Sequence, residues 1–173
     1  MTTGLYVGRF QPFHTGHLEA VKHILSHVDD LIILVGSAQH SHTVENPFTA
    51  GERLTMIKLA LKEAGIDPAR YMVTPLPDAE FHKVWVAHLL SQTPEFQLAF
   101  TNEPLTGRLL KEAGIRVERI PFYHREIYSA REVRQRMLNG SDWETLVPRS
   151  IVAYLKKIDG VNRINEISLS DNP

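Results

Sequence analysis

Two histidines that flank a glycine, in the order His14-Thr-Gly16-His17, are the side chains of this chain best suited to chemistry on an anion. They end a loop that begins at Gly8, after a short apolar run, and they lead into a stretch with helical spacing of apolar residues. The first turn of a helix has unpaired backbone N–H groups and the positive end of the helix dipole. Glycine lets a ligand approach that backbone closely. The pattern therefore predicts a phosphate site in the loop 8–17.

Two other interpretations of these histidines stay open on the residues alone. As capping residues they would only stabilise the start of the helix. As zinc ligands they would need a carboxylate or a third histidine at a suitable spacing, and none follows. The chain has no cysteine, which excludes thiolate zinc, an iron–sulfur cluster and a cysteine nucleophile. We therefore assign no residue to a metal.

A parallel sheet has to position this loop. The apolar runs 5–7 and 31–35 each end in glycine and are typical of buried strands, and the stretch between them has helical periodicity. Together they form a βαβ unit. Further strands are expected at 71–74, 97–100 and 116–120, with helices between them. We predict an α/β fold with a Rossmann-like, doubly wound, parallel five-stranded sheet.

Helices are expected to extend this sheet at the C-terminal end. The segments 49–52 and 129–132 both match the capping box, in which a hydroxyl and a carboxylate accept hydrogen bonds from each other's backbone N–H groups. An apolar stripe over 151–158 predicts a last helix that ends near Gly160. Residues 169–173 are expected to be a frayed tail.

The composition excludes several classes of protein. A length of 173 residues corresponds to about one domain, which we place at 1–168. With 43% hydrophobic and 23% charged residues, the chain has an ordinary globular balance. A formal charge of −1 predicts neither a nucleic-acid partner nor an anionic membrane partner. No apolar run approaches the length of a membrane helix and no signal peptide pattern is present, so we expect a cytoplasmic protein.

The loop 8–17 resembles the HxGH signature of the nucleotidyltransferase α/β-phosphodiesterase superfamily, whose members transfer nucleotides and release pyrophosphate. The segment 128–134 resembles its second signature, ISxTxxR, with the serine and the last arginine in place. Arg131 stands where the family usually has threonine, so a cation replaces a hydroxyl. The resemblance implies catalytic roles for His14, His17 and Arg134. It implies ATP binding by Gly8, Arg9, Phe10, Gly16, Ser129, Arg131 and Arg134.

Further segments resemble the archaeal type of nicotinamide-nucleotide adenylyltransferase, and the likeness spans about residues 4–165. These segments are 8–14, 36–39, 46–53 and 142–143. The resemblance implies that ATP and nicotinamide mononucleotide are the substrates, that NAD is the product, and that the protein forms a homo-hexamer. From general chemistry we expect Mg²⁺ as the cofactor, ligated mainly by ATP phosphates and water.

The resemblance places the nicotinamide nucleotide against Ser37, Asp78 and Trp85. An indole face can stack on a flat ring for about 0.5–1.5 kcal/mol beyond burial, and a carboxylate in a loop after a strand can accept a hydrogen bond. The alternatives are a core tryptophan on an amphipathic helix and an aspartate that caps a helix. His82 stands where the family often carries a small amide residue.

We expect an adenylyltransferase in which the 5′-phosphate of nicotinamide mononucleotide attacks the α-phosphorus of ATP in line. Two other functions stay open. One is another HxGH nucleotidyltransferase, with phosphopantetheine or an alcohol phosphate as acceptor. The other is a non-catalytic nucleotide sensor that retains the fold. The preference between nicotinamide and nicotinate nucleotides is also left open.

Overall fold

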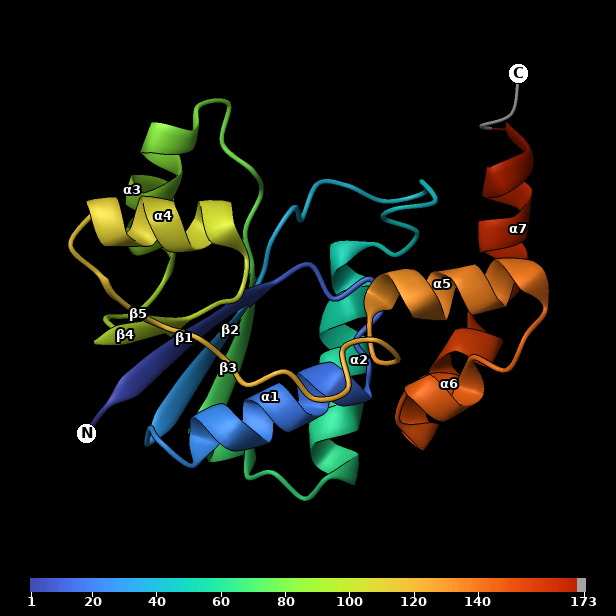
Figure 1. Ribbon diagram of the computed structural model, residues 1–173, viewed down its shortest axis with the longest axis horizontal. Helices are drawn as coiled ribbons and strands as arrows, with labels where there is room; N and C mark the ends of the chain where they lie inside the picture. Colours follow the sequence, from blue (N-terminus) through green and yellow to red (C-terminus); the bar gives the residue numbers. More distant parts are fainter. Residues whose placement is uncertain (171–173) are drawn as a thin grey trace. The chain divides into compact units, whose positions relative to one another are not determined.

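The computed structural model describes residues 1–170, which divide into two compact units (Figure 1). The sheet unit comprises Met1–Arg9, Ala20–Ala38 and Asp67–Pro121, and the helical unit comprises the rest of the described chain. The chain first passes from one unit to the other between Arg9 and Phe10, inside the predicted phosphate loop. The assignment of 1–168 to one domain stays a prediction.

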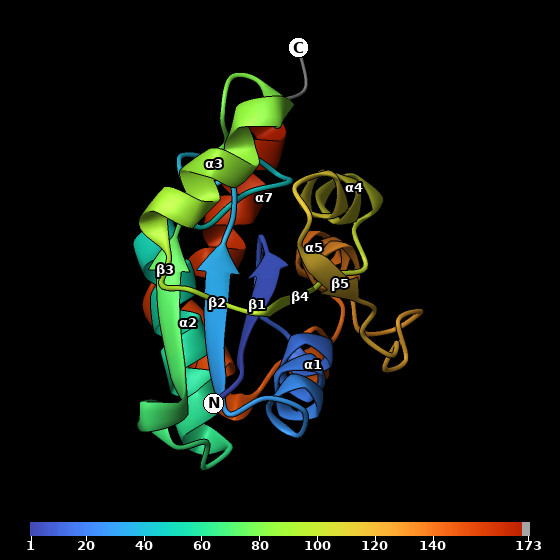
Figure 2. The same cartoon turned by 90° about the vertical axis from the view of Figure 1, so that its left-hand side faces the viewer.

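The sheet unit contains five parallel strands in the order β3-β2-β1-β4-β5 (Figure 2). This confirms the predicted doubly wound sheet. Because β1 pairs with β2 on one side and β4 on the other, the order of the chain reverses at β1, and ligands of such sheets bind beyond the carboxyl ends at that point. The strands are β1 (Thr3–Gly8), β2 (Asp30–Val35), β3 (Tyr71–Pro75), β4 (Leu98–Phe100) and β5 (Arg116–Glu118).

Helices cover both faces of this sheet, as the near-continuous apolar strands require. Figure 1 shows α3 (His82–Gln92) and α4 (Pro104–Glu112) on one side, and the last turns of α1 (Thr15–Leu25) on the other. A 3₁₀ turn, η1 (Pro68–Arg70), precedes β3. The core under α3 and α4 is formed by the buried residues Leu5, Ile32, Leu34, Leu76, Val86, Leu89, Ala99 and Leu110.

The helical unit contains α2 (Ala50–Glu63), α5 (Ala130–Asn139), η2 (Glu144–Leu146), α6 (Arg149–Lys157) and α7 (Gly160–Ser170). The first predicted capping box is confirmed, because Thr49 Oγ1 accepts from Glu52 N–H at 3.2 Å and Glu52 Oε2 accepts from Thr49 N–H at 2.9 Å. None of the helices within residues 1–170 is long and apolar enough to cross a membrane.

The second predicted capping box, at the start of α5, is wrong in one of its two bonds. Ser129 Oγ accepts from Glu132 N–H at 3.1 Å, as predicted. The Glu132 carboxylate instead accepts from Arg136 Nε at 2.9 Å, one turn further along the helix. An arginine four residues away offers a charged partner that the backbone N–H of Ser129 does not match.

The C-terminal extension has one more helix than predicted. The expected last helix ends at Lys157 as α6, and Gly160 begins α7 instead of ending a helix. A Cβ at Gly160 would lie 3.2 Å from both Leu155 Cδ2 and Phe48 Cε1, so close packing favours glycine here. Helix α7 continues to Ser170, so residues 169–170 of the expected tail are helical, and 171–173 lie outside the described residues.

An ion pair ties α7 to the start of α2. Arg163 donates to the two Glu52 carboxylate oxygens at 2.7 and 2.8 Å, and both side chains are about four-fifths buried. Burial raises the pKa of Glu52, but the hydrogen bonds from Arg163 and Thr49 outweigh it and hold that pKa below its usual value. The folded state therefore favours the ionised carboxylate.

We expect Arg163→Met to lower the free energy of unfolding by about 1.5–3 kcal/mol at pH 7, because it leaves a partly buried carboxylate without its charged partner. The folded pKa of Glu52 is lowered, so this stabilisation is present above the unfolded carboxyl pKa of about 4.3 and is lost as the pH falls through the folded pKa. Chemical denaturation of both proteins at pH 7, 5 and 3 measures the difference between their free energies of unfolding. This difference should become smaller as the pH falls.

Arg108→Met is the matched control, since its pair with Glu112 on α4 is exposed and is expected to contribute less than about 0.5 kcal/mol. The interpretation that the Arg163–Glu52 ion pair stabilises the fold would be contradicted by an equal loss of unfolding free energy in the two variants. A loss from Arg163→Met that does not change with pH would contradict it as well.

Candidate nucleotide-binding site

The loop between β1 and α1 is held together by aromatic rings. Phe10 is buried and has a positive φ of 54°, a left-handed conformation that costs a residue with a Cβ about 1–2 kcal/mol. Its ring packs on Phe13, with centroids 5.7 Å apart, and edge-on against His17, with centroids 4.9 Å apart. These contacts offset the backbone strain and bring the loop back over the start of α1.

The two predicted histidines lie against each other. The rings of His14 and His17 are stacked, with centroids 3.6 Å apart and an interplanar angle of 25°. Burial lowers the pKa of His14 to about 3. Burial, followed by the charge of His14, also holds the pKa of His17 well below its usual range. Both rings are therefore neutral at pH 7.

The backbone fixes the tautomer of each ring. His17 Nδ1 accepts from His14 N–H at 3.2 Å, and His14 Nδ1 accepts from His17 N–H at 3.4 Å. A neutral imidazole whose Nδ1 is an acceptor carries its proton on Nε2. The pair thus presents two Nε2–H donors from a rigid, uncharged arrangement, which suits anionic oxygen atoms.

Gly16 has a packing role that the sequence did not reveal. A Cβ at this position would lie 3.0 Å from His14 Cε1 and 3.1 Å from Tyr128 Cβ. The missing side chain leaves room for the His14 ring and for Tyr128, in addition to the close ligand approach expected from the sequence. The histidine loop and the residue before Ser129 are therefore neighbours.

Arg134 and Ser129 come to this loop on α5. Arg134 Nη1 donates to the backbone oxygen of Gln11 at 2.7 Å, and Ser129 caps the helix. Arg131 is exposed in the first turn of α5. The helical unit thus contains most of the predicted phosphate-binding residues, namely Phe10, His14, Gly16, His17, Ser129, Arg131 and Arg134.

The remaining predicted site residues belong to the sheet unit. Gly8 ends β1, where its backbone oxygen accepts from Gly36 N–H at 2.9 Å, and Arg9 is exposed directly after it. Ser37 has a positive φ of 47° and donates through Oγ to Asp78 Oδ1 at 3.1 Å. The structure therefore pairs two of the three predicted nicotinamide residues beyond the carboxyl ends of β2 and β3.

Trp85 fits the interpretation as a tryptophan of the core, and its stacking on a nicotinamide ring stays a prediction. Its side chain packs against the core under α3 and α4, yet the residue is only partly buried. His82, in the first turn of the same helix, is exposed. The proposed alternative for Asp78, a helix cap, is not observed, because Phe81 is the N-cap residue of α3.

Sequence reasoning missed two buried polar residues of the helical unit. Gln11 is 2% exposed and Arg53 is 0% exposed. The signal was present for Gln11, since an amide between Phe10 and Pro12-Phe13 stands in an apolar setting where it must find partners. For Arg53 there was no local signal, because an arginine in the first turns of a helix is usually exposed.

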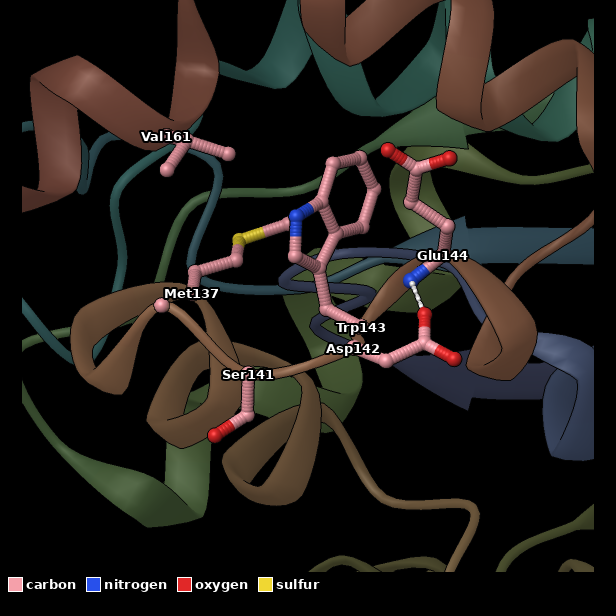
Figure 3. A pocket seen from close by; sticks show the side chains of 7 residues that line it. Met137, Ser141, Asp142, Trp143, Glu144 and Val161 are labelled. Atoms are coloured by element: carbon pink, nitrogen blue, oxygen red, sulfur yellow. Dashed lines mark hydrogen bonds between the residues drawn. The ribbon is translucent and has the colours of Figure 1, made fainter.

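A cavity of about 260 Å³ in the helical unit contains none of the predicted site residues (Figure 3). The figure shows the Trp143 indole beside the Met137 thioether, with Val161 across from it. Asp142 and Glu144 at its rim are engaged, the first with Glu144 N–H at 3.2 Å and the second with Lys156 at 2.7 Å. Over the described residues, no three histidine, aspartate or glutamate side chains gather as they would around a metal ion.

Comparison with known proteins identifies the family of this chain. The cytidylyltransferase-like family model matches residues 5–136. A nicotinamide-nucleotide adenylyltransferase of Methanolobus tindarius is 49% identical over 99% of this chain and 97% of its own. One of Archaeoglobus fulgidus is 49% identical over 96% of this chain and 97% of its own. The chain belongs to the nicotinamide-nucleotide adenylyltransferase family.

A solved structure agrees with the fold of this adenylyltransferase family member. A bifunctional NMN adenylyltransferase/ADP ribose pyrophosphatase from Francisella tularensis, complexed with AMP and a Mn ion, matches with a TM-score of 0.76 at 23% identity. The match covers 95% of this chain and 52% of that one, so the chain spans about half of the bifunctional protein. At this identity the likeness shows the fold alone.

We expect Gly16→Ala to lower the free energy of unfolding by about 1–3 kcal/mol, because the new methyl group overlaps the His14 ring and Tyr128. Gly51→Ala is the control. A Cβ at Gly51, in α2, meets nothing within 4 Å, so this change should stabilise the protein by about 0.5–1 kcal/mol. Urea denaturation at pH 7 compares the three proteins. Equal stabilities of Gly16→Ala and the unchanged protein would contradict this expectation, because they would show that a methyl group fits beside the His14 ring and Tyr128.

Proposed function

We propose that this protein transfers AMP from ATP to nicotinamide mononucleotide and so makes NAD and pyrophosphate. The observation that carries the proposal is the stacked, neutral pair His14–His17, which offers two Nε2–H donors in the loop after β1. The relatives named nicotinamide-nucleotide adenylyltransferase, at 45–49% identity, support the choice of substrates.

The reaction is an in-line displacement. A 5′-phosphate oxygen of nicotinamide mononucleotide forms a bond to the α-phosphorus of ATP, and the bond from that phosphorus to the α–β bridging oxygen breaks. Pyrophosphate leaves with the electron pair, so no side chain has to act as a nucleophile. Correct placement of the two substrates supplies up to about 7–11 kcal/mol of the barrier.

The helical unit carries the groups that stabilise charge on the phosphates. His14 and His17 donate from Nε2 to oxygens of the α- and β-phosphates, where negative charge develops. Because burial keeps the pKa of both rings low, these donors do not depend on pH near neutrality. Arg134 holds the β- and γ-phosphates, and the Ser129 end of α5 and the region of Gly16 offer backbone N–H groups. For Arg9, which belongs to the sheet unit and directly follows β1, we likewise propose a role in binding ATP.

The divalent ion fits this arrangement as a companion of ATP. Across residues 1–170 the structure holds no carboxylate or histidine cage, and Mg²⁺ retains much of its hydration, so phosphate oxygens and water would be its main ligands. Bound in this way it offsets phosphate charge. We propose Mg²⁺ for this protein, and Mn²⁺ would serve the same role, in line with the ion in the Francisella structure.

The sheet unit carries the groups proposed for the nicotinamide nucleotide. The Trp85 indole, in a residue that is only partly buried, stacks on the pyridinium ring, where a cation adds to the attraction. Asp78, held by Ser37 Oγ, accepts from the amide or a ribose hydroxyl. The resemblance to the archaeal family extends the proposal to a cytoplasmic homo-hexamer.

The test is turnover. We expect the protein to form NAD and pyrophosphate from ATP, Mg²⁺ and nicotinamide mononucleotide, and to leave phosphopantetheine and glycerol 3-phosphate unchanged.

His17→Ala should lower kcat at least about a hundredfold, since loss of one donor to the transition state costs about 2.7–4 kcal/mol. His27→Ala, an exposed histidine after α1, should leave kcat unchanged. Circular dichroism checks folding. Near-normal kcat in His17→Ala would refute its role, and ATP binding without turnover would indicate a sensor.

Trp85→Ala tests the nicotinamide side. We expect it to raise the dissociation constant of nicotinamide mononucleotide about tenfold while ATP binding stays within twofold, because only the first substrate has a ring to stack on this indole. Isothermal titration calorimetry measures both. Ala substitution at His88, partly buried on the same helix, is the control for general effects on α3. A change confined to ATP affinity would overturn the assignment.

A further inference from the structure

The side chain of Gln11 joins the histidine loop to a distant segment of the helical unit. Its Nε2 donates to Phe48 O at 2.8 Å, and its Oε1 accepts from Phe48 N–H at 2.9 Å. The amide thus pairs with both backbone groups of one residue, 37 positions along the chain. Gln11 and Phe48 are both buried, at 2% and 0% exposure, so water does not compete for these bonds.

The segment that Gln11 binds is itself firmly held. Arg53 Nε donates to Thr49 O at 3.3 Å, and Arg163 Nη1 donates to Pro47 O at 3.4 Å. Thr49 N–H is bound by Glu52 in the capping box of α2. The backbone on both sides of Phe48 therefore has charged partners that fix it to α2 and α7.

The backbone oxygen of Gln11 binds a different residue from its side chain. It accepts from Arg134 Nη1 at 2.7 Å, although Arg134 lies on α5, 123 residues further along the chain. One residue thus connects a rigid anchor, the segment 47–49, with the guanidinium that we assign to the triphosphate. His14 follows only three residues later in the same loop.

We propose that Gln11 is a positioning residue for adenylyl transfer. Its amide locks the loop onto the segment 47–49, and its carbonyl holds the Arg134 guanidinium at one fixed place relative to the His14–His17 pair. This inference rests on the proposed function, since it assigns Gln11 an effect on ATP through Arg134. Gln11 itself touches no substrate in this scheme.

The chemistry explains why glutamine is needed here. A primary amide offers a donor and an acceptor side by side, as the N–H and C=O of Phe48 require. An ionised glutamate of the same size has no donor and would turn an oxygen toward Phe48 O. Methionine has a similar length and offers neither bond. Both replacements leave the loop with its volume but without its connection to the anchor.

The experiment measures kcat and the KM values of both substrates for Gln11→Met. We expect kcat/KM for ATP to fall about ten- to a hundredfold, as for a catalytic group displaced by about 1 Å, and KM for nicotinamide mononucleotide to stay within twofold. Gln135→Met, exposed on α5, is the matched control and should leave all values unchanged. Should Gln11→Met fail to fold, Gln11→Glu carries the same comparison.

A second set of variants separates positioning from general stability. Leu155→Ala removes a fully buried side chain of α6 and should lower Tm without changing KM for ATP. In an Arg134→Ala background, Gln11→Met should lower kcat/KM for ATP further by less than about threefold, because Gln11 acts through that guanidinium. Independent roles would multiply the two effects instead.

The outcomes distinguish this proposal from the proposed function. If the unchanged protein makes no NAD, the function itself fails. If it makes NAD and Gln11→Met only lowers Tm, as Leu155→Ala does, then Gln11 is a structural residue and the positioning proposal is overturned. Multiplicative effects of Gln11→Met and Arg134→Ala, or a change in KM for both substrates, would overturn it as well.

Discussion

The need to satisfy buried polar groups governs the loop between β1 and α1. A loop that is covered by aromatic rings cannot leave its amides to water, so each must find a partner inside the protein. Here His17 Nδ1 accepts from His14 N–H and His14 Nδ1 accepts from His17 N–H, while the buried Gln11 side-chain amide pairs with the backbone of Phe48. The same bonds that satisfy the backbone fix both imidazoles as neutral Nε2–H donors. The folded conformation of the loop therefore also sets the tautomer of each of its two histidines.

The loop also concentrates local strain, which the rest of the helical unit has to offset. Phe10 adopts a left-handed backbone with a full side chain, and a Cβ at Gly16 would be crowded by the His14 ring and Tyr128. In the same unit, Arg53 is completely buried and donates to the backbone oxygens of Thr49 and His40. A buried guanidinium is costly unless its donors are used, and here they hold a loop segment in place. The segment 47–49, to which Gln11 binds, is thus held by the charged side chains of Arg53 and Arg163.

The sheet unit contributes a different kind of order. Its parallel strands end together, so residues that follow β2 and β3 meet although about forty positions separate them. Ser37 and Asp78 show this, and the positive φ of Ser37 aims its hydroxyl at the carboxylate. Trp85 packs against the core under α3 and α4, although the residue is only partly buried.

The sequence by itself determined the α/β class, the five strands, most helix starts and the histidine loop, because these depend on periodicity and on short spacings such as His14-x-Gly16-His17. It did not determine the break between α6 and α7, the partner of the Glu132 carboxylate, or the burial of Arg53. It also did not show that Gln11 joins Phe48 to Arg134. These features depend on contacts between residues that are adjacent only after folding, and one sequence holds no local pattern for them.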